Sequence, residues 1–212
     1  GIFLYLSKQK VNDIKAVTKE TQCNIHSKMI RLISILLALS LVSAELQLVH
    51  RSDWQAVPPS DTLDDLKHPV PNVIIMHTAT EQCLDRTKCD SLCRFIQSYQ
   101  MDVRKWYDIA YNFLVGGDGL IYEGRGWDKV GAHTKGFNSD SIGIAFIGTF
   151  NGKLPPGKSL DIVKSLLEEG LKNGKISPNY KLFGQRQLNG SKSPGDALYE
   201  EIKKWDHWSE KV

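Results

Sequence analysis

The sequence predicts an α/β fold, in which a single domain holds a central mixed β-sheet covered by helices. One observation is a hairpin: Ile109–Val115 is aromatic and β-branched, as strands are, and residues 120–123 return as a second strand. Between them, Gly116-Gly117-Asp118-Gly119 tolerates the positive φ angles of a tight turn. The other observation is that helical apolar patterns alternate with further strand-like segments. Helices interleaved with strands, one hairpin among them, indicate a sheet of mixed direction with helices packed on it.

The first half of the domain contributes one strand and one helix before the hairpin. Asn72–Met76 is a compact apolar strand that we expect near the centre of the sheet. Asp90–Met101 repeats apolar residues at helical spacing, with Asp90 or Ser91 as the N-cap. The apolar positions of this predicted helix are Leu92, Phe95, Ile96 and Tyr99.

The second half supplies two strands and two helices after the hairpin. Ser141–Phe150 is predicted as a strand, and residues 160–171 form an amphipathic helix that Asn173-Gly174 ends. Residues 180–183 are predicted as a last short strand. Asp196–Trp205 is expected to be a closing helix, capped by Asp196.

Composition and charge exclude one class of partner. The chain has 212 residues with a formal net charge of +3. That length suits one domain with additional N-terminal sequence. The positive charge is too small to argue for binding to nucleic acid.

Residues 29–44 predict a secretory signal peptide. A short basic segment begins at Met29, the run from Ile33 to Val42 is strongly apolar, and small residues precede a cleavage point after Ala44. The apolar run is shorter than the roughly 20 residues that cross a bilayer, so no membrane span is expected in the mature chain. Residues 1–28 are interpreted as an upstream segment outside the fold. The domain then occupies residues 45–212 of a secreted, extracellular protein.

We interpret the cysteines of the mature chain as those of a secreted protein, which folds in an oxidising compartment. Cys83 and Cys89 close a short loop, and pairing between them is favoured. Metal binding is the other option, although two thiols alone lack the further ligands of a zinc site. Cys93 follows Cys89 by one helical turn and is expected to be a buried free thiol. Exchange with Cys89 and an intermolecular bridge are the alternatives.

The loop between the second hairpin strand and residue 141 is long for a compact domain. It carries Arg125, His133, Thr134 and Asn138. Loops of this length are often binding surfaces, and a solvated surface loop is the equal alternative on pattern alone.

Several ordered segments resemble one known family. They are I-I-M-H-T-A at Ile74, C-x5-C at Cys83, Y-N-F-L-V-G-G-D-G-L-I-Y-E-G-R-G-W at Tyr111, G-A-H-T-K-G-F-N at Gly131, S-I-G-I-A-F-I-G at Ser141, and S-x-S-P-G-D-A-L-Y at Ser191 followed by W-x-H-W. Over His50–Trp208 the chain resembles the peptidoglycan recognition proteins, in particular short secreted members of insect type, which are relatives of phage-type lysozyme-amidases. The resemblance implies the N-acetylmuramoyl-L-alanine amidase-like fold and a groove for peptidoglycan fragments. That family contains zinc amidases and receptors that only bind.

The chemistry of three positions separates these two kinds. The amidases resembled here draw their zinc ligands from H-H-T-A, G-H-R and T-x-C-P-G, and the matching residues in this chain are Met76, Gln185 and Ser193. A thioether, an amide and a hydroxyl make a poor site for zinc. Tyr111, which assists the reaction in the amidases, is retained but cannot hold a metal alone. We therefore expect no cofactor and no catalysis, with a zinc-dependent amidase as the alternative.

The groove residues implied by the resemblance suit a muropeptide, the peptide-bearing sugar unit of peptidoglycan. Aromatic faces cover sugar and alanine CH groups, polar side chains supply hydrogen bonds, and arginine meets a carboxylate. The matching residues are His77, Thr78, Trp106, Tyr111, Arg125, His133 and Asn138. The expected partners are bacterial peptidoglycan and muropeptides, together with a second copy of the chain or a downstream immune signalling protein.

Arg125 also bears on which peptidoglycan is bound. Family members that favour the meso-diaminopimelic acid type resemble this chain in having Arg in Y-E-G-R-G-W. Diaminopimelic acid differs from lysine by an extra carboxylate, which a guanidinium can read. Lys105-Trp106 agrees with the Gly-Trp of that pattern at Trp106 and departs from it at Lys105.

Overall fold

The sheet is mixed, as predicted, and its strands run in the order β1-β4-β3-β5-β2-β6. The structure is a computed structural model that describes Met29, Leu46 and residues 48–211. The strands are β1 (Leu48–Val49), β2 (Val70–His77), β3 (Phe113–Val115), β4 (Ile121–Glu123), β5 (Ser141–Phe146) and β6 (Ile176–Gly184). In this part of the chain β3 and β4 pair antiparallel, and the other neighbouring strands pair parallel.

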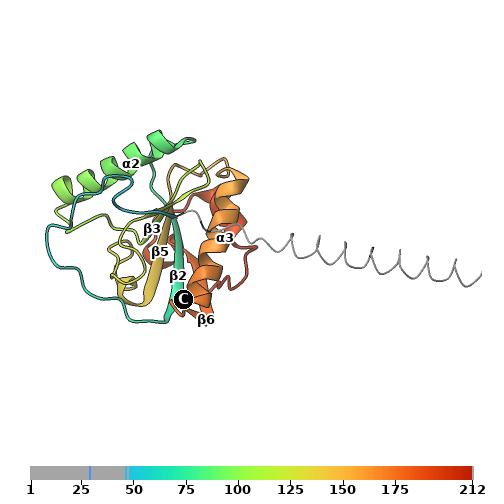
Figure 1. The fold of residues 1–212 in the computed structure, drawn as a ribbon. Coiled ribbons are helices and arrows are strands. Elements are labelled where there is room, and N and C mark those ends of the chain that lie inside the picture. The colour runs from blue at the N-terminus through green and yellow to red at the C-terminus, as the bar shows by residue number, and fades with distance from the viewer. Residues whose placement is uncertain (1–28, 30–45, 47, 212) are drawn as a thin grey trace, which may run out of the picture. The chain divides into compact units, whose positions relative to one another are not determined.

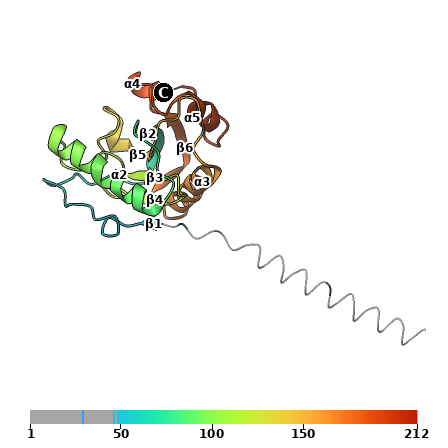
Figure 2. The same cartoon turned by 90° about the horizontal axis from the view of Figure 1, so that it is seen from above.

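Helices cover both faces of the sheet. The helical segments are α2 (Arg86–Ser98), the π-helical turn η1 (Tyr99–Val103), the 3-10 turn η2 (Asn138–Asp140), α3 (Gly157–Lys172), α4 (Arg186–Asn189) and α5 (Asp196–Ile202). Figure 1 shows α2 and α3 on opposite sides of the strands, and Figure 2 shows α5 on the same side as α3. The predicted arrangement of a central sheet covered by helices is confirmed.

The chain divides into two units, Gly1–Glu45 and Leu46–Val212, and the fold described here belongs to the second. Apart from Met29, the upstream segment and the expected signal peptide lie outside the described residues. In the part that is described, no helix combines the length and the apolar character needed to cross a bilayer.

Strand β2 lies between β5 and β6 and joins two apolar layers. Successive side chains of a strand point to opposite faces. Val73 and Ile75 pack in the cluster that includes Val163 and Leu166 of α3. Met76 packs in a small cluster on the other face. The central position predicted for this strand is confirmed, and its carboxyl end carries the first candidate site residues.

The hairpin forms where its turn chemistry predicts. The N–H of Gly116 donates to the carbonyl oxygen of Leu120 over 3.0 Å, and Gly119 has a φ of 84°. The strand before the turn is shorter than expected, because residues 110 and 111 bond to the following loop instead of extending the hairpin ladder. The carbonyls of Ala110 and Tyr111 accept hydrogen bonds from the N–H groups of Ala132 and Arg125.

The prediction for the helix before the hairpin was wrong in its cap and in half of its apolar face. Asp85 is the N-cap, where its side chain accepts a hydrogen bond from the N–H of Lys88, so neither Asp90 nor Ser91 caps the helix. Leu92 and Ile96 are buried as predicted, whereas Phe95 and Tyr99 are 59% and 42% exposed. The buried stripe is Cys89, Leu92, Cys93, Ile96 and Gln97.

The cap of the closing helix was also predicted incorrectly. The N-cap of α5 is Gly195, with a φ of 92° and no side-chain hydrogen bond. The Asp196 carboxylate instead accepts a hydrogen bond from Arg186 over 2.8 Å. The helix ends at Ile202, before the expected Trp205. The short elements β1 and α4 had no signal in the sequence pattern.

The cysteines are arranged as predicted. Cys83 and Cys89 form a disulfide, and Cys93 is a buried free thiol in the same apolar cluster. Burial raises the pKa of the Cys93 thiol, with the nearby Asp90 carboxylate adding to the effect. The disulfide packs against the turn of the hairpin, since the Cβ of any side chain at Gly116 would lie 2.9 Å from the Cys89 sulfur.

Candidate functional site

The three positions that match zinc ligands meet at the carboxyl ends of β2 and β6. Met76 is the penultimate residue of β2, and the N–H of Gln185 donates to the carbonyl of its neighbour Ile75 over 3.0 Å. The hydroxyl of Ser193 accepts a hydrogen bond of 3.0 Å from the N–H of His77. Parallel pairing of β2 and β6 therefore gathers residues that lie more than a hundred positions apart in the chain.

None of these three side chains is free to hold a metal ion. Met76 is fully buried and packs against Tyr111, Phe137 and Leu188. The amide of Gln185 donates to the carbonyl oxygen of His133 over 2.7 Å. The set offers no thiolate and no imidazole, which are the usual zinc ligands beside carboxylates. Among the described residues, no group of three His, Cys, Asp or Glu side chains is placed to hold a metal ion. The residues present do not fit a zinc ion.

His77 is held in one orientation beside this cluster. The N–H of Phe150 donates to its Nδ1 over 3.2 Å. Burial lowers the pKa of His77, and the positive charge of Arg186 lowers it further. The ring is therefore neutral at neutral pH. Since Nδ1 accepts a hydrogen bond, the neutral ring carries its proton on Nε2 and acts there as a donor.

Three of the predicted ligand residues line one hollow of ≈ 370 Å³ beside α2. These are Thr78, Trp106 and Tyr111. Trp106 is 38% exposed, so its ring is available to a ligand. The hollow is lined in full by Thr78, Ala79, Thr80, Phe95, Ile96, Tyr99, Gln100, Arg104, Trp106 and Tyr111. A concave surface of aromatic and polar side chains is typical of a small-molecule site.

The π-helical turn η1 shapes the wall of this hollow. It turns Gln100 inward, where its side-chain oxygen accepts a hydrogen bond of 2.8 Å from the N–H of Ala110. Its carbonyl oxygen accepts one of 3.0 Å from the N–H of Trp106. Both bonds fix the segment that presents Trp106. Such π-helical turns occur often at functional sites.

Tyr111 closes the hollow from the side of the sheet. Burial raises its pKa to about 12, with the Gln100 amide opposing the effect. The hydroxyl is therefore protonated at neutral pH and can donate a hydrogen bond to a ligand.

The structure places His133 and Asn138 in the long loop, and the carbonyl oxygen of His133 contacts Gln185. Burial, together with the positive charge of Arg125, lowers the pKa of His133 to about 3. Its Nδ1 lies 3.1 Å from the Thr134 hydroxyl, and its Nε2 has no hydrogen-bond partner within the described residues. The side-chain oxygen of Asn138 accepts a hydrogen bond of 2.7 Å from the N–H of Thr134. Both residues order the loop beside the substituted zinc positions.

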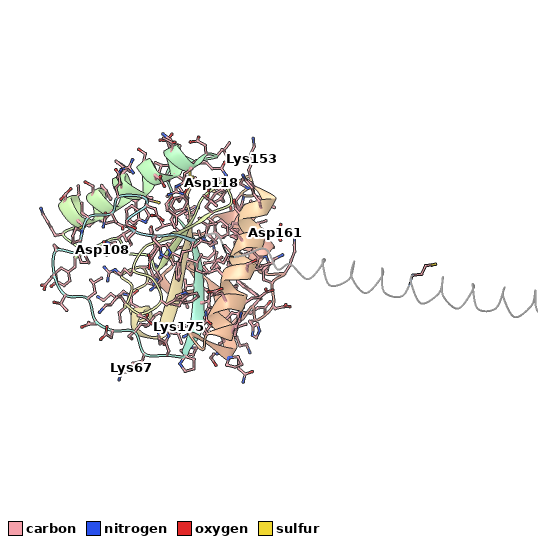
Figure 3. All side chains as sticks on the ribbon, viewed as in Figure 1. Lys67, Asp108, Asp118, Lys153, Asp161 and Lys175 are labelled. Atoms are coloured by element: carbon pink, nitrogen blue, oxygen red, sulfur yellow. A yellow bond between two sulfur atoms is a disulfide. The ribbon has the colours of Figure 1, made fainter. Side chains whose placement is uncertain are left out.

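Arg125 lines a different hollow, of ≈ 540 Å³, on the other side of residues 108–111. Its Nε donates to the Ile109 carbonyl and its Nη1 to the Val130 carbonyl, each over 2.7 Å. Nη2 makes a longer contact of 3.5 Å with the Asp108 carbonyl and is the least engaged end. Burial lowers the pKa of Arg125, although the Asp108 carboxylate opposes this. Figure 3 shows Asp108 on the α2 side of the molecule.

The sequence analysis missed the other residues of the hollow beside α2. Phe95, Ile96 and Tyr99 were assigned to the core, and Ala79, Thr80, Gln100 and Arg104 were not singled out. Tyr99 and Gln100 belong to the π-helical turn, and Arg104 ends it. A π-helical turn has no sequence signature of its own, so the pattern did not reveal these three.

Comparison with known proteins defines the class of this fold and site. The profile of the N-acetylmuramoyl-L-alanine amidase family matches residues 66–196. Peptidoglycan-recognition protein SD of Drosophila melanogaster is 41% identical over 171 residues, which cover 81% of this chain and 92% of that protein.

Two solved structures are similar over almost the whole length of their own chains. Peptidoglycan recognition protein-LE in complex with tracheal cytotoxin, a monomeric diaminopimelic acid-type peptidoglycan, is 48% identical, with a TM-score of 0.76 and coverage of 76% of this chain and 95% of that one. The ectodomain complex of peptidoglycan recognition proteins LCa and LCx bound to tracheal cytotoxin has a TM-score of 0.76, 48% identity and coverage of 77% and 99%. The protein is thus an amidase-like domain. Within that class, the chain belongs to the peptidoglycan recognition protein family.

Proposed function

We propose that this chain is a secreted receptor that binds peptidoglycan fragments and does not cleave them. The observation that carries the proposal is the state of Met76, Gln185 and Ser193. They occupy one cluster at the end of the central strands, and each side chain is committed to packing or hydrogen bonding. Hydrolysis of an amide by a zinc enzyme needs a metal with an open position for water. This cluster offers neither the ligands nor the opening.

The ligand is a muropeptide that lies along the hollow beside α2. Trp106 offers an exposed ring, Tyr111 a protonated hydroxyl and His77 an Nε2–H donor. Together with Thr78 they supply hydrogen bonds to the peptide carbonyls and apolar contact to the sugar, while His133 and Asn138 hold the adjoining loop in place. The similar protein LE is bound to a diaminopimelic acid-type fragment. Arg125 supports the same preference here: it lines the neighbouring hollow, so a fragment that extends past residues 108–111 would bring its additional carboxylate to Nη2.

The receptor acts outside the cell and passes the bound state to another protein. The predicted signal peptide of residues 29–44 directs secretion, and the Cys83–Cys89 disulfide suits an oxidising compartment. The partner is a second copy of the chain or a downstream immune signalling protein. The similar ectodomain complex of LCa and LCx, to which tracheal cytotoxin is bound, supports a ligand-induced contact of this kind.

The decisive experiment compares the wild-type mature chain with the variant Met76→His, Gln185→His, Ser193→Cys. We expect the wild type to bind muropeptide in calorimetry, to carry no stoichiometric zinc, and to release no stem peptide from peptidoglycan. We expect the triple variant to gain zinc. Near one zinc per wild-type chain together with metal-dependent peptide release would establish the alternative, a zinc amidase. Absence of muropeptide binding by a folded wild type would overturn the receptor function.

A further inference from the structure

A third hollow, of ≈ 280 Å³, lies on the side of the sheet away from the muropeptide residues. It is formed by α3, by β6 and by the segment that follows α5. Leu167 and Trp205 from its lining pack in the apolar cluster with Val73 and Ile75. Met76 and Tyr111 belong to the cluster on the opposite face. Figure 2 shows α3 and α5 on one side of the sheet and α2 on the other, so the two hollows are separate sites.

The floor of this hollow is aromatic and held rigidly. The ring of His207 stacks on Tyr180 with centroids 4.1 Å apart and an interplanar angle of 20°. Its Nδ1 lies 3.1 Å from the Tyr180 carbonyl oxygen, which fixes the ring from a second direction. His207 is exposed and has a φ of 65°, a left-handed conformation that a non-glycine residue adopts at a cost. The outer face of the imidazole is thus presented in one fixed orientation.

An unpaired donor belongs to the same lining. Trp205 is 9% exposed, and its indole Nε1 makes no hydrogen bond within the described residues. The Glu201 carboxylate is near enough to interact with this indole, but not in hydrogen-bonding geometry. A buried indole N–H usually has an acceptor.

The rim carries charged side chains of both signs, and its two lysines are already paired. Lys164 lies 4.0 Å from the Asp161 carboxylate and 5.8 Å from the centre of the Trp205 ring, and Lys204 pairs with Glu201 at 2.9 Å. Glu168 and Asp206 have no cationic partner within 4.0 Å in the described chain, so both carboxylates are open as acceptors. Open carboxylates beside paired lysines disfavour an anion and suit a ligand with many hydroxyl donors.

We propose that this hollow is a second binding site and that its ligand is a single pyranose ring of a neutral glycan. The volume lies at the small end of ligand pockets and matches one ring. The apolar face of the sugar rests on His207, as apolar surfaces do on aromatic rings. Its hydroxyl groups donate to Glu168 and Asp206. The proposal does not depend on the ligand of the hollow beside α2.

The test titrates the mature chain, labelled with ¹⁵N, with N,N′-diacetylchitobiose and follows the NMR spectrum. We expect saturable shifts of the Trp205 indole and of the Asp206 and His207 amides at probe concentrations up to about 20 mM, since a small neutral sugar binds weakly. Glu168→Gln combined with Asp206→Asn removes both charged acceptors. We expect this variant to weaken binding by roughly tenfold or more.

Glu169→Gln is the matched control. It removes one carboxylate from α3 without changing a residue that lines the hollow, and the glutamine oxygen can still accept the hydrogen bond from Asn173. We expect its titration to equal that of the wild type. His207→Asn keeps a residue that tolerates the left-handed conformation and removes the ring, so it should also lose binding. Shifts confined to residues beside α2, no shifts at all, or equal affinity for the Glu168→Gln, Asp206→Asn variant would overturn the proposal.

Discussion

Phe150 fixes the tautomer of His77. Its backbone N–H donates to Nδ1 over 3.2 Å, so Nδ1 must be the unprotonated nitrogen of the neutral ring. The proton then resides on Nε2. A ligand atom that meets this nitrogen must be an acceptor, such as a peptide carbonyl or a carboxylate.

Long-range ¹H–¹⁵N NMR of the imidazoles checks this relationship. We expect His77 to show a protonated Nε2 and to stay neutral at pH values where an ordinary histidine is charged, because its pKa is lowered by burial and by Arg186. His207 should show the opposite tautomer in the same spectrum, because its Nδ1 faces the Tyr180 carbonyl and must carry the proton. A protonated Nδ1 on His77 would contradict the assignment.

Because His133 is buried, the free energy of unfolding of the protein falls at acidic pH. In the unfolded chain His133 takes up a proton near its ordinary pKa of 6.5, whereas in the folded chain the pKa is about 3. Stability from the neutral ring is complete above pH 6.5 and is lost as the pH falls toward 3. At pH 4.5 the loss is about 2–3 kcal/mol.

Urea unfolding of the wild type and of His133→Gln at several pH values tests this effect. We expect the free energies of unfolding of the two proteins to follow parallel curves above pH 6.5 and to diverge below it, with the wild type falling more steeply. Parallel curves down to pH 4.5 would show that His133 titrates normally in the folded protein.

Local chemistry determined which elements the sequence could predict. The hairpin was predictable because a Gly-Asp-Gly turn is encoded by neighbouring residues, and the disulfide because Cys83 and Cys89 are close in the chain. The bounds of α2 and the inward position of Gln100 were not predictable, because they depend on which face packs and on a π-helical turn.

The candidate site, too, could be predicted from the sequence only in part. Met76, Gln185 and Ser193 were grouped by resemblance, and no local pattern joins them, since strand order brings them together. Arg125 lines a different hollow from the one that contains Trp106, and residues 108–111 lie between the two. The spacing of the motifs in the sequence gives no sign of this separation.

Lys105 has a left-handed backbone, with a φ of 59°. This conformation destabilises a non-glycine residue by about 1–2 kcal/mol. Glycine avoids that strain but loses roughly 0.5–1 kcal/mol more backbone entropy on folding, which offsets part of the gain. The Gly-Trp pattern of the related proteins thus suits the path that this chain follows before Trp106. Lys105 departs from that pattern in its side chain and not in its backbone.

We expect Lys105→Gly to stabilise the protein by roughly 0.5–1 kcal/mol in urea unfolding, because the strain is removed. Lys105→Ala keeps the strain and should give no gain. Muropeptide affinity should be the same in all three proteins. A loss of affinity in both variants would instead show that the lysine side chain contacts the ligand.

Arg125 provides the test of which peptidoglycan is preferred. Its Nε and Nη1 are held by the carbonyls of Ile109 and Val130, which leaves Nη2 to meet the additional carboxylate of diaminopimelic acid. A charge-assisted hydrogen bond contributes roughly 1.5–3 kcal/mol, or about ten- to a hundredfold in affinity. We therefore expect Arg125→Thr to weaken binding of the diaminopimelic acid muropeptide by that factor and to leave the lysine form nearly unchanged.

Measuring both muropeptides on the same protein sample separates selectivity from stability. Arg125→Thr leaves the Ile109 and Val130 carbonyls without their donor, at a cost of roughly 1–3 kcal/mol each where they stay buried. Partial unfolding lowers both affinities alike, so their ratio reports the lost carboxylate contact alone. Arg125→Lys keeps the charge without the planar fork and should fall between the wild type and Arg125→Thr in that ratio. An unchanged ratio in Arg125→Thr would mean that Arg125 holds the loop in place and does not read the carboxylate.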